Sequence, residues 1–296
     1  MRLARPGGGT RGSSGVEVRL LGRPDERATL AYLERQPARD VFIASRVLND
    51  GVLRAPGWSP LWGAFSTSSG ELVGVIHVGP NVVPAFDDSV VCDALAPTAA
   101  GSAATRMLVG ERLAVERLWE LIGTTYPPPR EVRARQYVYA VDPGIIIPPE
   151  GTPAGVARLA TPADEDRVLH LSAAMYTEEI SENPLARDPS GYRRRVQILT
   201  ARGWTYVYEV GGELQFKMDV GCASDRGAQI QGVYVPPAVR GQGLGTEAMA
   251  ACCELAFERH PALSLYVNDF NAPAVALYER LGFQREPYDF QTVILP

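Results

Sequence analysis

The sequence predicts an α/β (α+β) protein of two consecutive domains, each of which combines strands, hairpins and helices. Three observations lead to this prediction. With 296 residues, the chain is too long for one typical domain and fits two of ordinary size. Hydrophobic residues make up 46% of it and charged residues 21%, so each half can bury a core. A segment dense in proline and glycine, 142–155, separates two halves that both alternate strand and helix patterns.

These patterns divide the chain into four parts. Residues 1–15 are rich in Gly, Ser and Arg and lack the apolar core of a signal peptide, so we expect a disordered tail. The first domain is expected at 16–141 and the second at 156–296. The prolines and glycines of 142–155 exclude a helix or a central strand, which indicates an interdomain linker.

The first half alternates strands and helices. Two apolar segments, 61–66 and 71–78, flank a short polar stretch and predict a hairpin. The strands expected in this half are 16–21, 61–66, 71–78, 105–109 and 137–141. The helices expected are 24–34, a segment within 38–49, and 111–122. The order is not that of a simple βαβ array.

The second half carries stronger boundary signals. Thr161 is expected to cap a helix, because Pro162 follows at the first helical position and Asp164 lies three residues after the cap. Gly211 and Gly212 predict a two-residue hairpin. The strands expected here are 156–159, 204–210, 213–220, 230–235, 263–267 and 290–295. Four helices are expected here. The first is capped by Thr161, the second covers about 190–202, the third runs from the glycine-rich loop to about 259, and the fourth covers 273–281.

The most informative stretch is the glycine-rich loop at 240–245, which reads Arg-Gly-Gln-Gly-Leu-Gly between a strand and a helix. Glycines let backbone N–H groups approach a ligand, and a helix N-terminus presents unpaired N–H groups with a positive dipole end. The loop therefore predicts an anion cradle suited to a pyrophosphate. A Walker loop is excluded because Gly-Lys-Ser/Thr is absent. A dinucleotide fingerprint is disfavoured because the loop follows a hairpin.

At this point the sequence resembles the GNAT acetyltransferase superfamily. Arg240, Gly243 and Gly245 match the family's pyrophosphate-loop pattern. A second element, 271–283, matches the pattern of Asn, then Ala, then Leu-Tyr, then Gly-Phe at the expected distance. The combined match covers about 229–283, and two motifs in register are more specific than either alone.

The resemblance implies a mixed, mostly antiparallel sheet with a splayed central strand pair, flanked by helices, and acetyl-CoA as cofactor. The cofactor arm would pair with the backbone near Val233, and Asn271 would hydrogen-bond to it. Tyr278 would protonate the departing thiolate. The implied cofactor-binding residues are Val233, Tyr234, Val235, Arg240, Gly241, Gln242, Gly243, Leu244, Gly245, Thr246, Asn271 and Tyr278.

The general base is not identified by the motifs. Many family members use a glutamate on the strand before the loop, but Gln229 and Gln231 stand at the corresponding positions here. The candidates are Glu178 and Glu179, in the expected segment between the first two helices of the second half, which usually borders the acceptor site in the family, with Asp219 on the neighbouring strand as a third. For any single one of the three, a solvated surface carboxylate is the favoured interpretation.

A short segment of the first half is similar in sequence to a segment of the second. Residues 118–123, Leu-Trp-Glu-Leu-Ile-Gly, resemble 277–282, Leu-Tyr-Glu-Arg-Leu-Gly. The same offset places the first half's loop at 81–88, which lacks glycines and contains two aspartates, and Trp119 replaces the tyrosine. We therefore predict a degenerate GNAT-like first domain that does not bind acetyl-CoA, as in two-domain GNAT proteins of high-GC bacteria.

Charge and composition limit the partners. The net charge of −5 and the pI of about 5.4 disfavour a nucleic-acid binder, and no apolar run is long enough to span a membrane. Four scattered cysteines without a CxxC spacing indicate a reduced cytoplasmic location and no zinc site, and no metal site is expected. Lys217 is the single lysine among 29 basic residues, which is consistent with the codon bias of a GC-rich genome. It is expected either as a charged strand residue or as a contact to a cofactor phosphate.

The sequence therefore predicts an N-acetyltransferase that transfers acetyl from acetyl-CoA to a primary amine by direct attack in a ternary complex. The acceptor would be a small-molecule amine or a peptide or protein amine, and a homodimer is left open. One alternative is a mycothiol-synthase-like or aminoacyl-transferring tandem GNAT enzyme. Another, of a different class, is a CoA-binding sensor or interaction module without turnover.

Overall fold

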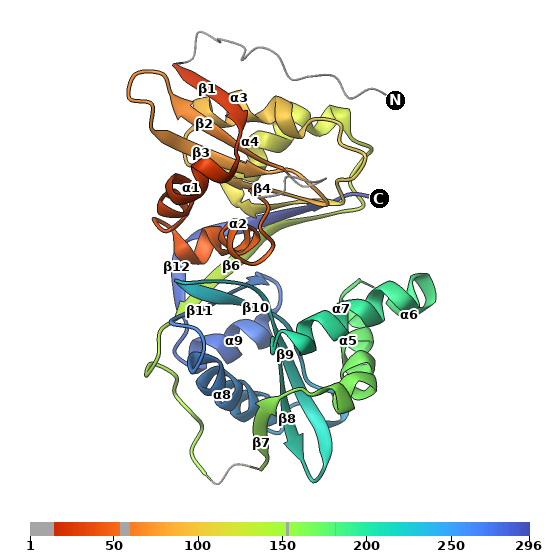
Figure 1. The fold of residues 1–296 in the computed structure, drawn as a ribbon. Helices are drawn as coiled ribbons and strands as arrows, with labels where there is room; N and C mark the ends of the chain where they lie inside the picture. Colours follow the sequence, from red (N-terminus) through yellow and green to blue (C-terminus); the bar gives the residue numbers. More distant parts are fainter. Residues whose placement is uncertain (1–14, 54–59, 152–153, 181) are drawn as a thin grey trace. The chain divides into compact units, whose positions relative to one another are not determined.

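The computed structural model describes residues 15–53, 60–151, 154–180 and 182–296. The tail expected over 1–15 therefore lies outside the described residues, apart from Gly15. The chain divides into two compact units. The first holds Met1–Val138 together with Glu286–Pro296, and the second holds Tyr139–Arg285 (Figure 1).

The first unit contains a mixed sheet with the strand order β1-β2-β3-β4-β5-β12-β6. Its strands are β1 (Val16–Leu20), β2 (Leu61–Ser66), β3 (Leu72–His77), β4 (Asn81–Ala85), β5 (Met107–Glu111), β6 (Glu131–Val141) and β12 (Gln284–Ile294). Its helices are α1 (Glu26–Leu33), α2 (Pro37–Asn49), α3 (Ser89–Ala99) and α4 (Arg112–Ile122). The sequence analysis predicted neither β4 nor α3.

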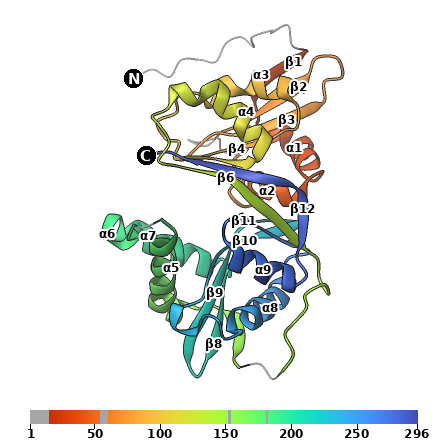
Figure 2. The same ribbon diagram turned by 180° about the vertical axis from the view of Figure 1, so that it is seen from behind.

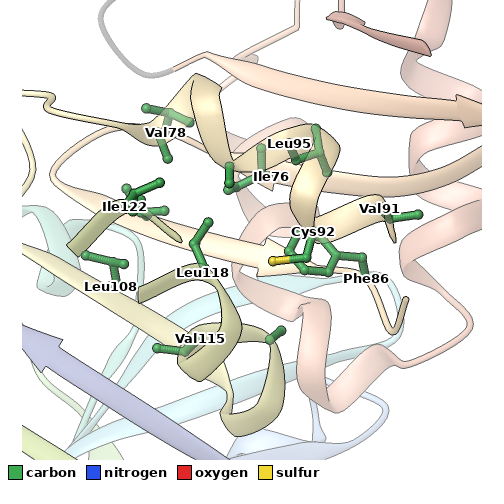
Figure 3. Close-up of a cluster of buried hydrophobic side chains, with 14 of the residues drawn as sticks. Ile76, Val78, Phe86, Val91, Cys92, Leu95, Leu108, Val115, Leu118 and Ile122 are labelled. Atoms are coloured by element: carbon green, nitrogen blue, oxygen red, sulfur yellow. The ribbon is translucent and has the colours of Figure 1, made fainter. Parts of the chain in front are cut away.

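A hydrophobic core lies between the sheet and the helices α3 and α4. The apolar residues of α4 recur at the three- and four-residue spacing of a helix face, so one side of the helix turns toward the sheet. Figure 3 shows the residues that meet there, which include Ile76, Phe86, Val91, Cys92, Leu95, Leu108, Val115, Leu118 and Ile122.

The C-terminal strand β12 belongs to the first unit from Glu286 onward. It pairs antiparallel with β5 from Phe290 opposite Glu111 to Ile294 opposite Met107. Val293 and Leu295 are buried in the core of the first unit. The sequence analysis placed all of 156–296 in one domain, and this pairing is the physical reason for the different division.

The second unit has the strand order β11-β10-β9-β8-β7. Its strands are β7 (Val156–Leu159), β8 (Thr205–Val210), β9 (Glu213–Ser224), β10 (Gly227–Tyr234) and β11 (Leu263–Asn268). Its helices are α5 (Glu165–Ile180), α6 (Pro184–Arg187), α7 (Pro189–Ala201), α8 (Leu244–Phe257) and α9 (Ala272–Arg280). In Figures 1 and 2, α5 and α7 lie on one face of this sheet, and α8 and α9 lie on the other.

Each unit contains one parallel strand pair that separates after a short contact. In the second unit, β10 and β11 pair only through Ala228 with Leu263 and Gln229 with Ser264. In the first, β4 and β5 pair only at Asn81 and Val82 of β4. The predicted fold of mixed, mostly antiparallel sheets with a splayed strand pair is thus confirmed in both units.

The segment between Val141 and Val156 contains no helix or strand in its described part, 142–151 and 154–155. It is attached to the second unit, because Ile146 is buried and the N–H of Ile147 donates to the carbonyl of Leu281 at 3.1 Å. Within the described residues, no helix combines the length and hydrophobicity needed to cross a membrane.

Candidate functional site

The centre of the candidate site is a bulge in β10. Gln231 lies opposite Asp219 of β9, but the next partnered residue, Tyr234, lies opposite Lys217. Three steps along β10 therefore match two along β9, which defines one extra residue in β10. Gly232 takes up the irregularity with a φ of +63°, a left-handed conformation that favours glycine. Because the pairing with β11 ends at Gln229, the bulge lies beside the splay.

The glycine-rich loop continues from this bulge to α8. Gly241 and Gly243 have φ angles of +75° and +84°, which explains why glycine stands at both positions. Gly243 occupies the N-cap of α8, and no side chain caps this helix end. The positive end of α8 and its first N–H groups are therefore available to an anion.

Three predicted site residues meet beside the loop. The carboxylate of Glu178, on α5, accepts hydrogen bonds from Tyr234 Oη and from an Nη of Arg240, both at 2.8 Å. Arg240 also donates from Nε to the carbonyl of Val235 at 2.8 Å. Desolvation alone would raise the pKa of Glu178, but the bonds from Arg240 and Tyr234 outweigh it and hold the pKa below its usual value.

Glu179, the second candidate base, is exposed at the end of α5. Its negative charge is one of the causes that raise the pKa of Tyr278. The end of α5 and the phenol of Tyr278 therefore act on each other electrostatically.

Tyr278 lies on α9 and is 6% exposed. Its ring packs between Tyr139, with ring centroids 6.3 Å apart, and Phe283, at 5.6 Å. Desolvation raises the pKa of its phenol well above the usual value, and the neighbouring Cys253 and Glu179 raise it further. The phenol therefore keeps its proton at neutral pH, as a general acid must.

Asn271 lies at the N-cap of α9. Its Oδ1 accepts a weak hydrogen bond from the N–H of Ala274 at 3.4 Å, which fixes the side chain at the helix end. Its role in holding a cofactor arm stays a prediction. The remaining loop residues, Gln242, Leu244, Gly245 and Thr246, form the turn before α8 and the start of that helix.

Lys217 and Asp219 form a buried ion pair under the bulge, which the sequence did not reveal. The Nζ–Oδ2 distance is 2.6 Å, and Lys217 has no exposed surface. Lys217 is thus a charged strand residue of β9, as the first of the two expectations had it, and its ammonium is bound by Asp219 and Ser172 and not by solvent. Only contacts across β8, β9 and α5 determine this burial.

The described residues contain no group of three or more His, Cys, Asp or Glu side chains arranged to hold a metal ion. The four cysteines are free and buried. Burial raises the pKa of the Cys92 thiol to about 12, which leaves it unreactive.

Comparison with known families agrees with this architecture. The Acetyltransferase (GNAT) family model matches residues 173–283, and a domain of unknown function (DUF4081) matches 59–168. The mycothiol acetyltransferase of Salinispora tropica is 32% identical over 131 residues, which cover 42% of this chain and 42% of that protein. The corresponding protein of Salinispora arenicola is 36% identical over 103 residues, 34% of this chain and 28% of its own length. The matches thus span less than half of these two relatives.

Solved structures show the same fold over nearly the whole chain. A tandem GNAT protein from the clavulanic acid biosynthesis pathway superposes with a TM-score of 0.56 at 15% identity, covering 94% of this chain and 98% of its own. A Drosophila protein superposes with a TM-score of 0.67 at 14% identity, covering 94% and 98%. The match to the Acetyltransferase (GNAT) family model therefore lies within the second unit, and the whole chain shares its fold with a tandem GNAT protein.

Proposed function

We propose that this chain is an N-acetyltransferase that moves an acetyl group from acetyl-CoA to a primary amine by direct attack within a ternary complex. One observation carries the proposal. A continuous stretch of backbone runs from the bulge at Gly232, through Gly241 and Gly243, to the uncapped start of α8. Splayed backbone followed by an open helix N-terminus suits an extended carrier that ends in a pyrophosphate.

The residues present fit acetyl-CoA, which supplies an activated acetyl thioester when it is bound. The N–H groups of 241–245 would hold the pyrophosphate at the positive end of α8, with Thr246 in the first turn beside them, and Arg240 would add a guanidinium. The backbone of Val233 to Val235 would pair with the pantetheine arm, and Asn271 would donate to it.

The chain's own side chains would handle two protons. The acceptor amine must lose a proton before it attacks. Glu178 is a poor acceptor because its two oxygens already receive bonds from Tyr234 and Arg240. Glu179, exposed at the end of α5, is the residue that we assign as the base, and Glu178 has the role of orienting Tyr234 and Arg240. Tyr278 would give its phenolic proton to the leaving sulfur.

The acceptor is proposed to be a mycothiol-related amine. Two of the relatives are named mycothiol acetyltransferases, and the acidic end of α5 suits an amine that arrives as a cation. The four free, buried cysteines are consistent with a reducing compartment, so we also propose a cytoplasmic location.

Isothermal titration of the purified chain with acetyl-CoA is the first test. We expect a single site per chain with a micromolar dissociation constant. Transfer is then tested by measuring the free CoA thiol that acetyl-CoA releases in the presence of a panel of amines. The panel compares the mycothiol precursor amine with simple polyamines and peptide N-termini. Transfer to one of these amines, above the rate of acetyl-CoA hydrolysis, supports the proposal.

Arg240→Ala provides a matched variant. We expect its affinity for acetyl-CoA to fall by about tenfold or more, because a hydrogen-bonded charge is lost. Binding without transfer to any amine would favour the non-catalytic CoA-binding module, for which the missing strand glutamate at Gln229 and Gln231 is the supporting observation. Absence of acetyl-CoA binding would overturn the proposal.

A further inference from the structure

The pair of Lys217 and Asp219 joins three elements of the second unit. The Nζ of Lys217, on β9, donates to Asp219 Oδ2 at 2.6 Å and to Ser172 Oγ, on α5, at 3.0 Å. The other carboxylate oxygen of Asp219 accepts from Thr205 Oγ1, on β8, at 2.9 Å. Lys217 is 0% and Asp219 is 6% exposed. Every one of these bonds lies within a single folded unit.

The same two residues lie directly opposite the bulge. Asp219 is the partner of Gln231 on one side of the irregularity, and Lys217 is the partner of Tyr234 on the other. A Cβ atom added to Gly232 would lie 2.8 Å from Asp219 Oδ2 and 3.2 Å from Lys217 Nζ. The bulge therefore packs closely on the ion pair, and neither can move far without the other.

A requirement for stability alone does not explain this pair. Desolvating two charges is costly, and well-packed apolar residues can replace a buried ion pair without loss of stability. Composition points the same way, because the other 28 basic residues of the chain are all arginine. A lysine kept where the chain otherwise uses arginine indicates a site that needs a compact ammonium and not a planar guanidinium.

We propose that Lys217 and Asp219 are positioning residues for acyl transfer, which fix the bulge of β10 and the helix α5 in one arrangement. The inference rests on the proposed function. From its position on β9, opposite the bulge, the ion pair sets the direction of the backbone N–H groups at Gly232 and Val233. Through Ser172 it also fixes α5, whose Glu178 and Glu179 lie about 9 to 11 Å further along the helix.

The test is the double variant Lys217→Met with Asp219→Asn, which removes both charges and keeps similar side-chain shapes. We expect the variant to fold, to bind acetyl-CoA within about threefold of the unmodified chain, and to show a kcat reduced about 10- to 100-fold, because small misplacements have effects of that size. Hydrogen exchange measured by mass spectrometry should accelerate in peptides covering 227–234 and stay unchanged in α8. The single variant Lys217→Arg keeps the positive charge but should still have a reduced kcat, because a planar guanidinium does not fit the site.

Arg158→Met with Asp164→Asn is the control for a merely structural effect. This pair, at 2.7 Å, ties β7 to the turn before α5 in the same unit. Its loss should lower the melting temperature without changing kcat or the exchange of 227–234. A double variant of Lys217 and Asp219 that keeps kcat within about twofold and leaves that exchange unchanged would overturn the inference.

The two proposals fail in different ways. An unmodified chain that neither binds acetyl-CoA nor transfers acetyl refutes the proposed function, whatever the variants do. The exchange measurement needs no substrate, so unchanged exchange of the bulge in the double variant refutes the positioning role even then.

Discussion

Tyr278 is the residue on which the proposed proton transfer to the leaving sulfur depends. Tyr278→Phe keeps the ring contacts with Tyr139 and Phe283 and removes only the hydroxyl. We expect kcat to fall by about 10²- to 10⁴-fold, the usual contribution of a general acid, with an unchanged dissociation constant for acetyl-CoA. Steady-state thiol release and calorimetry measure the two quantities. An unchanged kcat would remove Tyr278 from the mechanism.

Asp164 is a second residue whose ionisation has a measurable effect. It accepts from Arg158 at 2.7 Å and from the N–H of Thr161 at 2.8 Å, and these bonds, the arginine first, hold its pKa well below the usual value. Because the folded-state pKa is depressed, the stabilisation is full above the ordinary aspartate pKa of about 4 and is lost as the pH falls below it. The free energy of unfolding of the Asp164→Asn variant should therefore be about 2 kcal/mol lower than that of the unmodified chain at pH 7.

The check for Asp164 is thermal unfolding of both proteins between pH 7 and pH 3. The difference between their melting temperatures should narrow as the pH falls below about 4. A difference that stays constant over this range would mean that the carboxylate charge contributes nothing to stability.

At the scale of elements, the two units differ in how a helix begins after the splayed strand. In the second unit, α8 starts at Gly243 without a side-chain cap. In the first unit, α3 starts at Asp88, whose carboxylate accepts from the N–H of Val90 at 2.7 Å. A carboxylate already occupies the place where a phosphate would bind. We therefore predict that Asp88→Ala destabilises the first unit by about 1 kcal/mol without creating a second acetyl-CoA site.

Calorimetry of the Asp88→Ala variant decides this point, with the unmodified chain as the reference. A second site in the variant would mean that a single carboxylate separates the two units in function.

The elements that the sequence missed share a cause. Pro84 lies within β4 and Pro97 within α3, and a proline argues against each element when only local pattern is considered. Both elements form because tertiary packing outweighs local preference. The N-terminal capping box at Thr161 and the loop before α8 were predictable, because their signals are local.

At the scale of the whole molecule, the last strand determines where the first unit ends. β12 contributes Phe290 and Val293 to the cores of that unit, and Leu295, directly after the strand, joins them. Val293→Ala should destabilise the first unit by about 2 kcal/mol, because a fully buried aliphatic side chain is truncated. Differential scanning calorimetry should show an earlier transition for this unit, and hydrogen exchange should accelerate in peptides covering 107–122. Faster exchange confined to α8 would contradict this assignment of β12.

Contacts that are distant in sequence limited the prediction of both fold and site. The pairing of Thr292 with Val109 and the bond from Lys217 to Ser172 join segments with no shared local pattern. The loop, Asn271 and Tyr278 could be proposed because family motifs are contiguous in the chain. The ion pair under the bulge could not, because burial of a lysine depends on partners that only the folded unit brings together.

The burial of Lys217 has a practical consequence. It is the only lysine side chain in the sequence, and it has no exposed surface. In the proposed function the chain binds a reactive acyl donor, yet the folded second unit offers that donor no lysine side chain to acylate by accident. Amine-reactive dyes and cross-linkers will likewise reach this side chain only when the unit opens. The rate at which Lys217 is modified therefore measures the rate or extent of that opening.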